Sequence, residues 1–202
     1  AAAGKGTLAR RLADHFSYAY LDTGGLYRAV ALALLRDGVS PDNRDAAITA
    51  SAALDVTLLD DPALRDEATG SAASKIAAIP GVRSNLLEFQ RNFSKCPPNN
   101  ANGAVLDGRD IGTVVCPDAT VKFFVTATAT ERARRRHAEI IARGGTADYS
   151  EILADVEARD ARDMGRKDAP LAAAEDAYLL DTTELDIDAV FLRAVALIKE
   201  RQ

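Results

Sequence analysis

Residues 4–7 read GKGT and lead into a segment in which Leu8 and Leu12 recur at helical spacing. In a glycine-rich loop that runs into a helix, backbone N–H groups and the helix dipole bind phosphate oxygens. A lysine of such a loop reaches the outer phosphates, and a hydroxyl holds Mg²⁺. The stretch therefore predicts a nucleotide site in which Lys5 and Thr7 take those two roles. The alternative is a glycine-rich tail without a ligand.

The usual form of this loop, G-x-x-x-x-G-K-[ST], is only half visible here, because its first glycine is absent. The sequence starts at Ala1 without an initiator methionine and without a strand before the loop. We therefore expect a first strand to precede Ala1 and the sequence to be truncated.

Composition sets the class of protein. The chain has 202 residues, 48% of them hydrophobic and 27% charged, which predicts one main domain with room for an inserted subdomain. A net charge of -5 argues against broad binding to nucleic acid or anionic membranes. No apolar run approaches the roughly 20 residues of a spanning helix, so we expect a cytoplasmic protein. We also expect a monomer. Cys96 and Cys116 lack a C-x-x-C spacing and are interpreted as thiols.

Short apolar segments alternate with helical ones along the chain. The apolar segments at 18–21, 104–106, 121–125 and 178–180 predict strands. Such alternation indicates right-handed crossovers, and hence an α/β fold with a parallel sheet covered by helices on both faces.

Two stretches interrupt this alternation. Residues 54–83 are predicted to form a small insertion that begins with a short strand at Leu54, Val56 and Leu58 and continues into a helix. Residues 132–150 combine a basic helix with a glycine pair at 144–145, which predicts a mobile lid.

Charged and polar residues follow three of the predicted strands. Ligands in open parallel sheets bind at the carboxyl ends of the strands, so these positions predict the site. The residues are Asp22, Thr23 and Arg28 after the first strand, Asp107, Arg109 and Asp110 after the second, and Asp181 after the last.

The strings GKGT, LDTGGLYRAVAL, LDGRDIGTVV, RDARDMGR and AEDAYLLDTT occur in this order over nearly the whole chain, and together they resemble bacterial cytidylate kinases. Adenylate kinases share the first string but lack D-G-R-D-I-G-T. The resemblance implies a P-loop kinase fold with a monophosphate-binding insertion. It also implies a cytoplasmic enzyme that uses Mg²⁺ and moves the γ-phosphoryl group of ATP to CMP or dCMP.

The resemblance also implies roles for individual residues. Lys5, Arg28, Arg109 and Asp107 are the implied catalytic residues, the two arginines binding the CMP phosphate and Asp107 supporting Mg²⁺. Thr7 is the implied metal ligand. The implied ATP-binding residues are Gly4, Lys5, Gly6, Thr7 and Arg135. The implied acceptor-binding residues are Thr23, Arg28, Ser74, Arg83, Arg109, Asp110, Arg159, Asp163 and Arg166. Within this set, Ser74, Arg83 and Asp110 meet the cytosine edge, and Asp163 binds a ribose hydroxyl.

Several alternatives remain open from the sequence. The arginine run from 132 to 136 is also typical of a solvated helix face. Ion pairs along one exposed helix are likewise an alternative for Asp160, Arg162, Asp163 and Arg166. Ser74 is alternatively an ordinary surface serine, because the stretch between Leu59 and Glu67 is shorter than in the family. The chain as a whole is alternatively a kinase for another monophosphate or metabolite, or a nucleotide-binding regulator without transfer activity.

Overall fold

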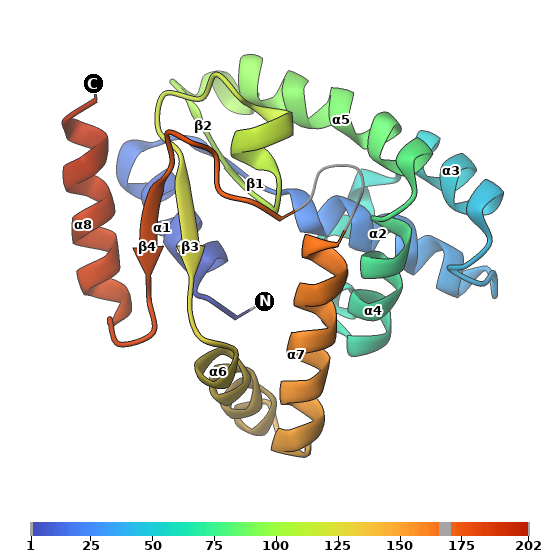
Figure 1. Cartoon of the computed structure of the whole chain (residues 1–202). Coiled ribbons are helices and arrows are strands. Elements are labelled where there is room, and N and C mark those ends of the chain that lie inside the picture. Colours follow the sequence, from blue (N-terminus) through green and yellow to red (C-terminus); the bar gives the residue numbers. More distant parts are fainter. Residues whose placement is uncertain (1, 166–170, 202) are drawn as a thin grey trace. The chain divides into compact units, whose positions relative to one another are not determined.

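A computed structural model describes residues 2–165 and 171–201 and divides the chain into two compact units (Figure 1). The terminal unit comprises Ala1–Ser17 with Arg109–Gln202, and the central unit comprises Tyr18–Gly108. Each unit contains a two-stranded parallel sheet and several helices, which confirms the α/β class. Among the described residues, no helix is long and apolar enough to cross a membrane.

The sheet of the central unit pairs β1 (Ala19–Asp22) with β2 (Ala104–Asp107). Both strands agree with the sequence prediction to within one residue. Their register pairs Asp22 with Asp107, so two acidic residues are neighbours where the parallel strands end. The prediction that polar residues after different strands gather at one sheet edge is confirmed for this pair.

The helices of this unit form its core. Leu26 and Val30 are one turn apart on α2, and both are at most 1% exposed because the apolar stripe of α2 faces the other helices. Ile76, Val82 and Leu86 belong to the same buried cluster. The helices are α2 (Thr23–Arg36), α3 (Arg44–Ala52), α4 (Glu67–Ile76) and α5 (Pro80–Lys95).

The predicted strand at Leu54–Leu58 is wrong. The chain from residue 56 to residue 65 instead contains two 3₁₀-helices, η1 (Val56–Asp60) and η2 (Pro62–Arg65). Asp55 accepts a hydrogen bond from the Thr57 backbone N–H at 2.9 Å, and Asp61 accepts one from Ala63 N–H at 2.9 Å. Such local side-chain bonds favour tight turns over an extended strand, although the apolar alternation is strand-like.

The terminal unit contains the second sheet, in which β3 (Phe123–Thr126) pairs with β4 (Tyr178–Asp181). The sequence predicted this strand from residue 121, whereas β3 begins two residues later, at Phe123. The ammonium group of Lys122 bonds Asp176 at 2.8 Å, which joins the chain just before the two strands. A further short 3₁₀-helix, η3 (Pro98–Asn100), precedes β2 in the central unit.

In the described part of the terminal unit the longer helices are α1 (Lys5–Phe16), α6 (Ala129–Ala142), α7 (Tyr149–Met164) and α8 (Ile187–Lys199). Helices α1 and α8 pack together, with an ion pair between Arg11 and Asp188 at 2.7 Å. Helices α6 and α7 form a hairpin that buries Ala133, Ile152 and Val156. Most of the predicted lid, residues 132–150, lies in this hairpin.

Candidate functional site

Helix α1 begins without any side-chain cap. Its N-cap residue is Gly4, which adopts a left-handed conformation (φ 77°), and the first turn contains no acidic residue. A glycine takes this conformation without strain, which explains its place at the turn into the helix. The first backbone N–H groups of a helix have no partner within it, so this terminus offers donors to an anion. Lys5 is the first helical residue, and Thr7 lies exposed two positions later.

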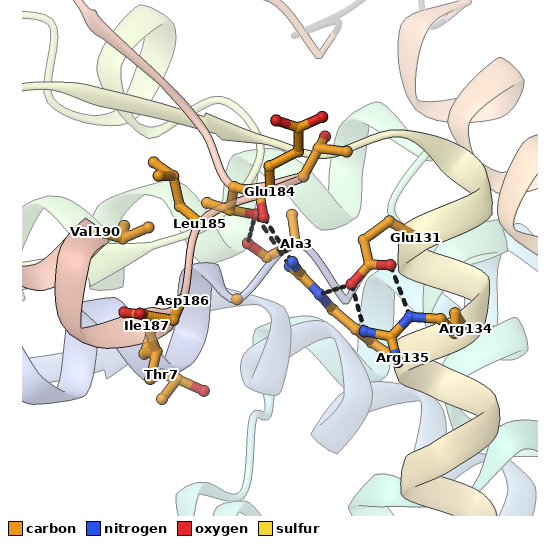
Figure 2. A pocket seen from close by; sticks show the side chains of 13 residues that line it. Ala3, Thr7, Glu131, Arg134, Arg135, Glu184, Leu185, Asp186, Ile187 and Val190 are labelled. Carbon is orange, nitrogen blue, oxygen red and sulfur yellow. Dashed lines mark hydrogen bonds and ion pairs between the residues drawn. The ribbon is translucent and has the colours of Figure 1, made fainter.

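A cavity of about 530 Å³ opens beside this terminus (Figure 2). Its volume lies in the range of small-molecule sites. Three segments of the terminal unit line it, namely the start of α1, the first half of α6 and the chain from the end of β4 into the first turn of α8. Residues from these segments are Gly4 and Thr7, Glu131 and Arg135, and Thr182 and Ile187. The structure thus brings the predicted ATP-binding residues Gly4, Thr7 and Arg135 to one cavity.

On the polar side of the cavity, Arg135 links α6 to the residue that follows β4. Arg135 donates from Nε to Glu131 at 2.8 Å, and from its two Nη atoms to the Thr182 hydroxyl at 3.0 Å and the Thr182 carbonyl at 2.6 Å. Figure 2 shows Glu131 bonded to both Arg134 and Arg135. The hydrogen bond from Arg134 is the main cause that lowers the pKa of Glu131 to about 2. Glu131 is therefore a carboxylate at neutral pH.

A second group of predicted residues gathers at the sheet edge of the central unit. Asp22 accepts a hydrogen bond from Gly25 N–H at 3.2 Å and thereby caps α2, and its other oxygen lies 3.6 Å from Arg28 Nη1. Thr23, 3% exposed, donates its hydroxyl proton to the carbonyl of Asp107 at 2.8 Å. Arg28 is thus held at the edge where β1 and β2 end.

Ser74 and Arg83 lie farther along the central unit. Ser74 is only 5% exposed, so its interpretation as a surface serine is wrong. Its hydroxyl oxygen has no hydrogen-bond partner among the described residues, and a buried polar atom in that state is costly without a ligand. Arg83 donates to the carbonyl of Ala77 at 3.1 Å and lies over the ring of Tyr27, 5.8 Å from its centroid.

In the terminal unit, Arg109 donates from Nε to Asp163 at 2.8 Å. The side chain of Asp163 is 3% exposed, and Asp110 is 7% exposed. Asp160 pairs with Arg132 of α6, in the same unit. The alternative of ion pairs along one exposed helix is therefore wrong for Asp160 and Asp163, because both pair with residues outside α7.

The arginines of α6 differ in burial and in their ion-pair partners. Arg132 is buried and bonded to Asp160, so the solvated-face interpretation is wrong for it. Arg134 is exposed and pairs with Glu131, and Arg136 pairs with Glu139 at 3.2 Å on the same helix. These last two fit the ion pairs expected of a helix surface.

Comparison with known proteins shows which family the chain belongs to. The family model described as "Cytidylate kinase" matches residues 1–200. The chain belongs to the cytidylate kinase family. A curated cytidylate kinase of Mesorhizobium japonicum is 57% identical over 200 residues, which cover 99% of this chain and 91% of the relative. A cytidylate kinase of Brucella suis biovar 1 is 56% identical over 98% of this chain and 89% of the relative. One of Brucella abortus strain S19 is 55% identical over the same shares.

Two more of the implied acceptor-binding residues of this cytidylate kinase family member are Arg159 and Arg166. Arg159 is half-buried on α7, next to Asp160, and Arg166 lies outside the described residues. Across residues 2–165 and 171–201, no group of three or more His, Cys, Asp or Glu side chains gathers as a metal cage. Cys96 is exposed and Cys116 half-buried, and both are thiols in the described structure.

Sequence reasoning did not predict Glu131 or Thr182 as part of a site in this family member. Thr182 directly follows β4, so the strand-end rule that selected Asp107 and Asp181 also covers it. Asp181 itself bonds the backbone N–H of Thr183 at 2.8 Å and its hydroxyl at 2.6 Å, which makes it a turn residue. Glu131 carried no comparable signal, because a glutamate in the first turn of a helix is common for capping alone.

Proposed function

We propose that this chain transfers the γ-phosphoryl group of ATP to CMP or dCMP and releases ADP with CDP or dCDP. The observation that carries the proposal is membership of the cytidylate kinase family over residues 1–200. The cavity beside α1 supports it, because the uncapped terminus of this helix, which begins at Lys5, offers N–H donors to the phosphates of ATP.

In this proposal the cavity takes ATP. The first N–H groups of α1 and the ammonium group of Lys5 bind its phosphates, and the base lies toward the apolar side of the cavity at Leu185, Ile187 and Val190. The Thr7 hydroxyl, which lines the same cavity, is a hard oxygen donor of the kind that Mg²⁺ prefers. Bound with ATP, Mg²⁺ supplies charge neutralisation between the phosphates. Asp107 is a second oxygen donor that we propose to support it.

The acceptor phosphate is bound by Arg28 and Arg109. A guanidinium suits this role because it stays charged and presents two parallel donors to phosphate oxygens. Each arginine is held through one of its nitrogen atoms by a carboxylate, Arg28 by Asp22 and Arg109 by Asp163. Such a contact orients the rest of the guanidinium for a ligand.

The cytosine is recognised by Ser74, Arg83 and Asp110. The buried Ser74 hydroxyl gains a partner when the base is bound, which relieves the cost of its burial. A carboxylate at Asp110 accepts from the exocyclic amine, and Arg83 donates to N3 and O2. Thr23, Arg159, Asp163 and Arg166 complete the proposed contacts, with Asp163 on the ribose hydroxyls.

Catalysis then requires positioning more than covalent chemistry. The two nucleotides are held in line, and positive side chains stabilise charge that develops on the transferred group. We propose that residues 132–150 act as a lid that excludes water, which would otherwise compete as the acceptor. We further propose a single P-loop kinase domain with its insertion at 54–83, acting as a cytoplasmic monomer.

The activity is tested by ADP release with a panel of acceptors. With ATP and Mg²⁺, we expect kcat/KM to be highest for CMP and dCMP and much lower for UMP, AMP and GMP. A coupled assay measures it. Preference for another monophosphate would contradict the base assignment while leaving a kinase, and ATP binding without ADP release for any acceptor would favour a regulator.

Arg28→Ala is expected to lower kcat/KM for CMP by about 100-fold, because it removes a charge-assisted contact to the acceptor phosphate. The affinity for ATP should change little. Steady-state kinetics and ATP titration separate the two effects. Arg36→Ala is the matched control on the same helix, since Arg36 pairs with Asp61 on the surface. A collapse of ATP affinity with normal use of CMP would place Arg28 on the wrong nucleotide.

A further inference from the structure

The side chain of Arg132 makes three hydrogen bonds to two groups, although it lies in the arginine run of the proposed lid. Its Nε donates to the carbonyl of Ala127, just after β3, at 2.9 Å. Its Nη1 donates to Asp160 Oδ1 at 2.9 Å, and its Nη2 bonds the second oxygen of the same carboxylate. The side chains of Arg132 and Asp160 are 11% and 22% exposed. Arg132 therefore joins β3, α6 and α7.

A pair of this kind fixes the orientation of both side chains relative to each other. Both ends are planar and bonded through two parallel hydrogen bonds, so rotation of either side chain breaks at least one of them. Loss of one partner would leave a largely buried charge uncompensated, which disfavours any position of α7 that separates the two residues. The pair consequently fixes α7 against α6.

The same face of α7 carries a residue of the proposed acceptor site. Asp163 follows Asp160 by three positions, and residues at that spacing are neighbours on a helix surface. Asp163 is bonded to Arg109 at 2.8 Å. This face of α7 is thus held at two points, by Arg132 from α6 and by Arg109 from the segment after β2.

We infer that Arg132 and Asp160 are positioning residues for the acceptor nucleotide, acting through α7 on Asp163. The inference rests on the proposed function, since it takes Asp163 as the ligand of the ribose hydroxyls. In this inference Arg132 helps to align the sugar of the acceptor nucleotide, whereas Arg28 and Arg109 are the arginines proposed to contact its phosphate. Small displacements of an aligned group cost much rate, so a shift of α7 is expected to appear as lost discrimination at the sugar.

The test compares CMP with 2′,3′-dideoxy-CMP, which lacks both ribose hydroxyls, in Asp160→Asn. This variant keeps the shape of the side chain and removes its charge. We expect the ratio of kcat/KM values for the two acceptors to fall about tenfold, while KM for ATP stays within about twofold of wild type. A pair with only a stabilising role would lower Tm and leave the acceptor ratio unchanged.

Three further variants complete the experiment. Arg132→Lys keeps the charge but loses the planar fork, and its ratio should fall in the same direction. Asp163→Asn reports the loss of the hydroxyl ligand itself. Glu139→Gln is the control, because Glu139 forms ion pairs with Arg136 and Arg143 on the surface of α6, and its ratio should equal that of wild type.

The outcomes separate the two hypotheses. An unchanged ratio in folded Asp160→Asn and Arg132→Lys, with a lowered ratio in Asp163→Asn, overturns the positioning role and leaves the ribose assignment intact. An unchanged ratio in Asp163→Asn removes the ribose assignment and the inference with it. If neither Asp160→Asn nor Arg132→Lys folds, the pair is required for folding itself, and the inference is also overturned.

Discussion

Lys5→Met is expected to lower kcat by about 10³-fold or more, while the fold stays intact. Lys5 is the first residue of α1, at an uncapped helix terminus where we propose that phosphate charge develops during transfer. Removal of one such cation acts on the transition state more than on the core. Methionine keeps the apolar length of the side chain, so packing along the stem is largely preserved. Single-turnover kinetics with CMP measure the effect, and thermal unfolding checks the fold.

Lys199→Met is the matched control, because Lys199 is an exposed lysine at the end of α8 in the same unit. It should retain the turnover of wild type. A folded Lys5→Met variant with near-normal kcat would remove Lys5 from the mechanism, and with it the proposed placement of ATP at α1.

Asp110→Ala is expected to reduce the preference for CMP over UMP, by up to about 10⁴-fold if Asp110 alone reads the exocyclic amine. Uracil presents a carbonyl where cytosine presents an amine, so a carboxylate there faces a second acceptor with no proton between them. The substitution should lower kcat/KM for CMP and leave the poor value for UMP nearly unchanged or improved. Both values come from the coupled assay.

Asp118→Ala serves as the control, because Asp118 is exposed in the same unit. Arg83→Ala should weaken both pyrimidines, since its proposed donors meet atoms near O2 as well as N3. An unchanged CMP-to-UMP ratio in Asp110→Ala would show that base selection lies elsewhere and would favour a kinase for another monophosphate.

Much of the architecture was predictable from local patterns. The four strands have short apolar cores bounded by turns, and α2 has an uninterrupted apolar stripe, so each signal is contained in a few neighbouring residues. The stretch at 54–58 misled because Leu54, Val56 and Leu58 alternate as in a strand. There the carboxylates of Asp55 and Asp61 bond nearby backbone N–H groups and stabilise turns.

The candidate site divides in a similar way. Asp22, Thr23 and Asp107 were predictable because strand ends mark the binding edge of a parallel sheet. The pairing of Arg132 with Asp160 was not predictable, since the partners are 28 residues apart and each has plausible partners on its own helix. Sequence spacing reports neighbours along a helix, whereas this pair depends on how two helices pack.

The engaged state of Arg135 has a consequence for the design of inhibitors directed at the cavity beside α1. All three nitrogen atoms of this guanidinium are already bonded, to Glu131 and to two atoms of Thr182. One N–H on each of the two Nη atoms remains for an acidic group of a compound, because a guanidinium has five donors. The carboxylate of Glu131 already offsets much of the positive charge of Arg135, so the net affinity gained from a new ion pair is small. Shape-matched apolar groups placed against Leu185, Ile187 and Val190 meet no such competition. Medicinal chemistry on this cavity should therefore build potency from its apolar wall.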